Sequence, residues 1–172
     1  MKTVAIIVFL VIFIFNLGSA QIKANEFESD VIKVAIVAND LNATLDFYVN
    51  VIGMTKVREF DIDNETSTRF GLSGGVPFHV IALKLNNTSQ ATELKIMSFE
   101  NKPENKKSKY IQDDVGVRYL TIYVKSIKPF VQRMKENKIL FLGQTPTSAG
   151  DDYQFILIQD PNGVFIELIG KD

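Results

Sequence analysis

The same order of predicted elements occurs twice along this chain, and this repetition limits the possible folds more than any other feature. Each half contains a strand, an amphipathic helix and three further strands. Runs of β-branched and apolar residues indicate the strands, and apolar residues spaced by three and four indicate the helices. The predicted strands cover residues 31–38, 55–62, 78–85 and 91–99 in the first half, and 117–124, 139–144, 153–159 and 164–169 in the second.

Each predicted helix follows directly on the first strand of its half. Asp40 and Ser126 supply polar residues that can cap the two helix N-termini. The apolar residues after each cap recur on one helix face, and Gly53 is a candidate C-cap for the first helix. The segment 63–75 is polar and is predicted to be a loop.

These elements predict an α+β fold made of two similar modules. One helix and one sheet per module leave an apolar face that the other module can cover. The charged stretch at residues 100–114 is the one credible linker. We therefore expect module one at residues 30–99 and module two at 115–170, which together form one domain over residues 30–170.

The N-terminal residues have the layout of a cleavable secretory signal peptide. Lys2 precedes an apolar run at residues 4–15 that is short for a membrane span, and Gly18 and Ala20 are small residues before the expected cut. Residues 1–20 are therefore predicted to be a signal peptide, and residues 21–29 an N-terminal tail. The mature protein is expected to be exported, secreted or periplasmic, with no membrane segment after cleavage.

Charge and residue content exclude several classes of function. Nineteen Lys and Arg against twenty Asp and Glu give a net charge of −1, so the basic excess used for nucleic-acid binding is missing. Cysteine is absent, which excludes disulfides, thiolate metal ligands and a cysteine nucleophile. His79 is the one histidine, so a single chain cannot offer two imidazoles to a metal.

Four Asn-X-Ser/Thr sequons are a further feature of the sequence. They begin at Asn42, Asn64, Asn86 and Asn87. In a eukaryotic secretory pathway these four residues are glycosylation candidates, whereas most bacteria would leave them unmodified. The sequence does not decide between a bacterial and a eukaryotic source.

Two stretches of the sequence resemble the vicinal oxygen chelate superfamily, which includes glyoxalase I, extradiol dioxygenases, and fosfomycin and bleomycin resistance proteins. The stretches are VAIVANDLNATLDFY at residues 34–48 and DPNGVFIELI at residues 160–169. The resemblance implies a glyoxalase-like fold, in which two βαβββ modules form a cupped cavity of mixed sheets. In metal-dependent members this cavity holds one divalent metal, which chelates two neighbouring oxygens of the substrate.

The resemblance places the metal-ligand positions of that family on Lys33, Lys95, Tyr119 and Glu167, and of these only the glutamate is a usual ligand. A lysine ammonium has no lone pair to give, and a tyrosine must first lose a proton whose pKa is near ~10. Two ammonium groups would also repel a divalent cation. We therefore expect no metal and no other cofactor.

A shift of two residues in the alignment would change this expectation. Such a shift keeps the same strand face and replaces Lys95 by Glu93. Glu93, Glu167 and His79 would then be the candidate ligands of a divalent metal.

Without a metal, the cavity is expected to bind a small molecule. Lys33, His79, Lys95, Tyr119 and Glu167 are predicted to line it. Two lysines and one glutamate leave a positive charge, which favours an anionic or oxygen-rich ligand. Glu167 is expected to pair with lysine, because an isolated buried charge is costly. In this interpretation the protein is similar to the bleomycin resistance branch of the superfamily, whose members bind their ligand without a chemical reaction. Members of that branch commonly form homodimers, so a homodimer is expected from the resemblance.

Two other functions stay open at this stage. One is an enzyme of the same superfamily, a lyase, isomerase or dioxygenase with an altered divalent-metal site, in which Glu167 is the candidate catalytic residue. The other is a secreted glycoprotein that uses the fold as an interaction scaffold. The sequence names neither the ligand nor a reaction.

Overall fold

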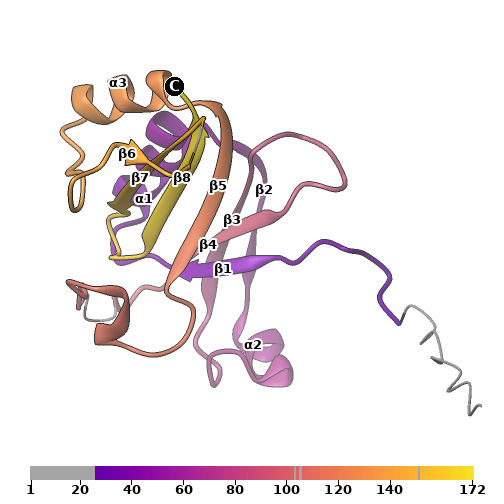
Figure 1. The fold of residues 1–172 in the computed structure, drawn as a ribbon. Helices are drawn as coiled ribbons and strands as arrows, with labels where there is room; N and C mark the ends of the chain where they lie inside the picture. The colour runs from indigo at the N-terminus through magenta and orange to yellow at the C-terminus, as the bar shows by residue number, and fades with distance from the viewer. Residues whose placement is uncertain (1–25, 103, 105, 151) are drawn as a thin grey trace, which may run out of the picture. The chain divides into compact units, whose positions relative to one another are not determined.

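The helices and strands follow one another in two similar series (Figure 1). The computed structural model describes residues 26–102, 104, 106–150 and 152–172. In chain order its elements are β1 (Val34–Val37), α1 (Leu41–Asp46), the π-helix η1 (Phe47–Ile52), β2 (Thr55–Ile62), α2 (Asn64–Phe70), β3 (Phe78–Lys84), β4 (Glu93–Ser98), the 3-10 turn η2 (Ile111–Asp113), β5 (Tyr119–Ser126), α3 (Lys128–Glu136), β6 (Thr147–Ser148), β7 (Tyr153–Gln159) and β8 (Phe165–Lys171).

Residues Val31–Asp172 form one compact unit. The predicted signal peptide at residues 1–20 lies outside the described residues, as do residues 21–25 of the predicted tail. Among the helices that the structure describes, none is long and apolar enough to cross a membrane.

Sheet A contains the four strands of module one in the order β1-β4-β3-β2. β1 runs parallel to β4, and the other neighbours are antiparallel. The register places Ala35 beside Lys95, Lys95 beside Ala82, and Ala82 beside Arg58. These four positions form a row across one face of the sheet.

Sheet B repeats this topology with the four strands of module two, in the order β5-β8-β7-β6. β5 runs parallel to β8, and the remaining pairs are antiparallel. Thr121 of β5 lies beside Glu167 of β8, which in turn lies beside Leu157 of β7. The predicted α+β fold of two similar modules is confirmed.

One hydrophobic core joins the two modules. It includes Ile81, Leu83, Leu94 and Ile96 from sheet A, Ile156, Ile158, Ile166 and Leu168 from sheet B, Phe47, Tyr48, Val51 and Ile52 from η1, and Ile127 and Met134 from α3. Successive residues of a strand point to opposite faces, so the residues between these point away from the shared core. We call these the outer face of sheet A (Lys33, Ala35, Arg58, Ala82, Glu93 and Lys95) and the outer face of sheet B (Tyr119, Thr121, Tyr123 and Glu167).

The turn after β7 fastens module two to the first helix of module one. Asp160, 1% exposed, accepts two backbone N–H groups of its own turn at 2.8 Å and the Tyr48 hydroxyl at 3.1 Å. The side-chain amide of Asn162 donates to the Thr44 hydroxyl at 3.0 Å. The Asp-Pro-Asn-Gly stretch therefore has a structural task, because its polar groups bind α1 and η1.

The segment 63–75 contains a helix, so the prediction of a loop there is wrong. The Asp63 side chain accepts the Thr66 N–H at 2.7 Å and caps α2 at its N-terminus. Gly71, with a φ of 68°, ends the helix in the left-handed region. Ser67 is the buried residue of α2, and such a polar helix lacks the apolar spacing that reveals a helix in a sequence.

The predicted strand at residues 139–144 is also wrong, because β6 covers only Thr147–Ser148. Gly143 has a φ of 62°, which interrupts an extended chain. The backbone N–H of Leu142 still donates to the Leu157 carbonyl at 2.8 Å, so the segment stays attached to β7.

The two predicted helices differ from expectation at one point each. α1 passes directly into η1, and Gly53 caps the end of η1 with a φ of 90°, as its place in the sequence predicts. α3 begins after Ile127 rather than after Ser126. The Ser126 hydroxyl nevertheless accepts the Lys128 N–H at 3.3 Å.

Candidate functional site

A buried carboxylate surrounded by cations occupies the outer face of sheet A. Glu93 begins β4, and its side chain is only 5% exposed. Arg58 Nη2 donates to Glu93 Oε1 at 2.7 Å, and Lys33 Nζ lies 3.8 Å from the same oxygen. Lys95 points to the same face two residues further along β4. We call these four residues the cation cluster.

The electrostatics of the cation cluster follow from these contacts. The hydrogen bond from Arg58 lowers the pKa of Glu93, and the charges of Arg58, Lys33 and Lys95 add to this effect. The same hydrogen bond raises the pKa of Arg58. Glu93 is therefore ionised at neutral pH, and three cations surround one anion.

Lys95 is the cation of the cluster with the fewest contacts to other charged groups. It makes no hydrogen bond or ion pair with any of the described residues, and it is half-buried. Lys33 is about half exposed and contacts Glu93 only at the longer distance. The cluster carries two formal positive charges in excess, because one of its three cations is balanced by Glu93.

The outer face of sheet B carries different chemistry. The Thr121 hydroxyl donates to Glu167 Oε2 at 2.6 Å, between strands that the parallel register places side by side. Tyr119 is 47% exposed and Tyr123 is 75% exposed. Two tyrosines and a carboxylate thus lie open on this face.

Lys33, Lys95, Tyr119 and Glu167 lie on two faces that both point away from the shared core. Within the described part of the chain, no hydrogen bond or ion pair joins Glu167 to either lysine. The expected pairing of Glu167 with lysine is therefore wrong, since Lys33 has Glu93 as its carboxylate partner.

His79 lies outside the cation cluster, in an acidic setting. Its Nδ1 is 2.7 Å from Asp61 Oδ1, and its Nε2 is 3.7 Å from Glu59 Oε2. It shares the strand face of Ile81 and lines a separate open pocket of about 690 Å³ with Asp61. The structure thus separates His79 from the other residues predicted for the ligand cavity.

The residues at the positions that the resemblance assigns to a metal do not fit a divalent cation. Two of them are lysines and one is a tyrosine, and the alternative ligand Glu93 is already bonded to Arg58. In the part of the chain that the structure describes, no group of three or more Asp, Glu or His side chains is arranged to hold a metal ion. The donor chemistry of the outer face of sheet A suits an anion better than a divalent cation.

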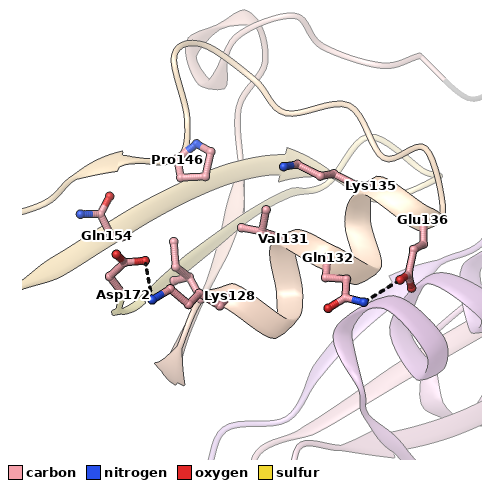
Figure 2. A pocket seen from close by; sticks show the side chains of 9 residues that line it. Lys128, Val131, Gln132, Lys135, Glu136, Pro146, Gln154 and Asp172 are labelled. Carbon is pink, nitrogen blue, oxygen red and sulfur yellow. Dashed lines mark hydrogen bonds and ion pairs between the residues drawn. The ribbon is translucent and has the colours of Figure 1, made fainter.

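Two pockets differ in how they are lined. A cavity of about 330 Å³ lies where β1, β4, η1 and β5 meet, and Tyr119 and Thr121 belong to its wall. A groove of about 510 Å³ runs along α3 (Figure 2). Charged and polar side chains form the rim of this groove, including the ion pair of Lys128 with Asp172 at 3.8 Å.

The four sequons lie in different local structures. Asn42 is exposed on α1, but the Thr44 of its sequon is buried. Asn64 donates its side-chain amide to the Gly75 carbonyl at 2.6 Å. Asn86 and Asn87 lie in the exposed turn between β3 and β4.

Arg58 is the site residue that the sequence did not reveal. It lies on β2 and reaches Glu93 because β2 pairs with β3 through an irregularity between Lys56 and Arg58. An alternation pattern gives the face of a strand, but it does not give the register between strands. The one feature of the sequence that points to Arg58 is that it is the only arginine in the predicted strand 55–62.

Solved structures with the same fold come from several organisms. A glyoxalase family protein from Bacillus cereus is 15% identical, with a TM-score of 0.69 over 86% of this chain and 98% of that chain. The trypanothione-dependent glyoxalase I of Leishmania major is 18% identical, with a TM-score of 0.58 over 81% of this chain and 85% of that chain. A glyoxalase family protein from Enterococcus faecalis is 22% identical, with a TM-score of 0.58 over 83% of this chain and 98% of that chain.

At these low sequence identities, the structural similarity shows the fold alone. The family is shown by the match to a family model. No curated protein matches the chain. The family model for the Glyoxalase/Bleomycin resistance protein/Dioxygenase superfamily matches residues 31–168, which is most of the sequence. The chain therefore belongs to the Glyoxalase/Bleomycin resistance protein/Dioxygenase superfamily.

Proposed function

We propose that this protein binds a small anionic or oxygen-rich ligand at the cation cluster, without the divalent metal of its metal-dependent relatives. The observation that carries the proposal is Lys95, a half-buried cation that makes no hydrogen bond or ion pair with a described residue, beside a carboxylate already bonded to Arg58. An anion between Lys33 and Lys95 would relieve the repulsion between the two ammonium groups.

The number of cations around Glu93 supports a binding role over a purely structural one. A buried carboxylate needs one good partner, and Arg58 supplies it at 2.7 Å. Lys33 and Lys95 add two cations that the carboxylate does not require. Excess charge of one sign on one face raises the local concentration of ligands of the opposite sign.

A homodimer is part of the proposal. The outer face of sheet B exposes Tyr123, and Glu167 has no cation partner in the described part of the chain. A second copy could bring Tyr123 and Glu167 over the cation cluster, where this carboxylate would complement the lysines. The ligand would then lie between the two copies.

We also propose export directed by residues 1–20.

The test is calorimetric titration of the full chain with inorganic phosphate and with malonate. We expect the double variant Lys33→Gln/Lys95→Gln to lose at least about tenfold in affinity for a bound anion. Lys125→Gln/Lys135→Gln removes the same charge from exposed positions outside the cluster, and should bind as the unmodified protein does. No heat of binding with either anion, or equal losses in the two double variants, would overturn the proposal.

A further inference from the structure

We propose that the cavity between β1, β4, η1 and β5 is a second binding site, for a small uncharged and largely apolar molecule. Its volume is about 330 Å³. The wall consists of Val34, Tyr48, Met54, Leu85, Thr92, Leu94, Tyr119, Leu120, Thr121 and Ile122. These residues come from both modules, so the cavity exists only when the modules are assembled.

The chemistry of the wall defines the class of ligand. None of the lining residues is charged, whereas the cation cluster has two positive charges in excess. Desolvating a charged ligand against such a wall is costly, while an apolar ligand gains from leaving water. Ligand sites of this size commonly have an apolar wall with a few polar groups that set orientation.

Two of the four side-chain hydroxyls in the wall are already engaged. The Tyr48 hydroxyl donates to Asp160, and the Thr121 hydroxyl donates to Glu167. The hydroxyls of Thr92 and Tyr119 make no hydrogen bond with any described residue. They are therefore the groups left to orient a ligand.

The mouth of the cavity exposes apolar surface that a ligand would cover. Leu85 is 49% exposed and Tyr119 is 47% exposed, although both line the cavity. Deeper in the wall, Leu94 and Tyr48 are buried in the shared core, which holds their positions. The site is therefore rigid at its base and open at its rim.

The α3 groove is a poorer match for such a ligand, although it is larger. Lys128, Lys135, Glu136 and Asp172 lie around it, and Figure 2 shows Lys128 paired with Asp172 across the rim. An apolar molecule there would lie against charged groups. The groove along α3 therefore serves as the internal comparison for the experiment.

The experiment uses N-phenyl-1-naphthylamine, an uncharged probe whose fluorescence rises in an apolar site, with the full chain. We expect saturable binding to the unmodified protein. Leu85→Asp places a charge at the mouth and should weaken probe binding about tenfold or more. Leu140→Asp makes the same change at an exposed leucine that does not line this cavity, and should leave binding unchanged.

A second variant keeps the proposal testable if Leu85→Asp does not fold. Thr92→Trp fills the mouth with an indole in a chain that has no other tryptophan. It should also weaken binding, and its indole fluorescence should be quenched by any probe that still enters. Absence of saturable binding by the unmodified protein would overturn the proposal. Equal losses in Leu85→Asp and Leu140→Asp, or probe-induced methyl NMR shifts at Val131 of the α3 groove instead of at Leu94, would do the same.

This outcome is independent of the anion titration. Lys33→Gln/Lys95→Gln should bind the probe as the unmodified protein does, because neither lysine lines the cavity. Loss of probe binding in that variant would show that the two sites are one, and would also overturn the inference.

Discussion

Arg58 decides the chemical state of Glu93 and thereby the charge of the outer face of sheet A. The Glu93 side chain is only 5% exposed, and without Arg58 its nearest cation would be Lys33, at 3.8 Å. With Arg58, the carboxylate is held in its ionised form by a short charge-assisted hydrogen bond. The two lysines beside this pair then give the face its excess of positive charge.

Arg58→Met should lower the free energy of unfolding by about 2 kcal/mol at neutral pH, because a buried carboxylate loses its main partner. The folded state lowers the pKa of Glu93, so its contribution is complete above the unfolded pKa of about 4.3. The contribution disappears as the pH falls through the folded pKa. The difference between Arg58→Met and the unmodified protein in urea titrations should therefore shrink towards zero in acid.

Lys56→Met is the matched control for Arg58→Met. Lys56 pairs with Glu59 on the exposed surface of β2, where ion pairs contribute little. Its unfolding curve should stay close to that of the unmodified protein. A difference for Arg58→Met that persists undiminished at low pH would contradict the assigned role of Glu93.

Glu167→Gln should change the free energy of unfolding by less than about 1 kcal/mol at pH 7. The reason is that a glutamine carbonyl can still accept the hydrogen bond that Thr121 donates to Glu167 at 2.6 Å. A buried ion pair broken from one side would instead cost roughly 3–5 kcal/mol. A loss of that size in a denaturant titration would contradict this prediction and would indicate that Glu167 forms a buried ion pair with a lysine.

At the scale of elements, the sequence predicted what periodicity encodes and missed what local geometry decides. The buried strands of both sheets and the helix C-cap at Gly53 follow from apolar pattern and residue type. α2 was missed because its cap, Asp63, precedes a helix with no apolar stripe. The strand predicted over 139–144 fails because Gly143 adopts a positive φ.

The turn at Asp160 adds hydrogen bonds between the modules to their shared core, and the Tyr48 hydroxyl donates one of them. Burial is the main reason that the pKa of Tyr48 is raised, and the charge of Asp160 and its hydrogen bond add to the effect. The folded state therefore keeps this tyrosine neutral, while the unfolded chain ionises near pH ~10. Stability should be unaffected by Tyr48 ionisation below that pH, and should fall as the pH rises above it.

Tyr48→Phe should cost about 1 kcal/mol at pH 7, the usual contribution of one hydrogen bond. It should also make the decline of stability between pH 9 and 11 shallower than in the unmodified protein, since one ionising group is gone. Tyr123→Phe is the control, because Tyr123 is 75% exposed. An equally steep alkaline decline in Tyr48→Phe, measured by thermal unfolding across this pH range, would contradict the raised pKa of Tyr48 in the folded state.

At the scale of the molecule, fold and family were predictable and the arrangement of the site was only partly so. Residue alternation gives the strand faces of Lys33, Lys95, Tyr119 and Glu167, and the order of elements gives two modules. The apolar face that each module leaves uncovered predicts that the modules pack together, and their buried residues form one core. Register between strands, which brings Arg58 to Glu93, is a long-range property that residue spacing cannot contain.

The central proposal is that this superfamily member binds an anion at the cation cluster, without the divalent metal of its metal-dependent relatives. The most direct measurement is the metal content of the full chain after equilibration with Zn²⁺, Mn²⁺ and Ni²⁺ and removal of unbound ions. The account predicts far less than one metal ion per chain, and a thermal unfolding temperature that a chelator does not change. About one ion per chain, released by a chelator and lost in Glu167→Gln, would contradict it.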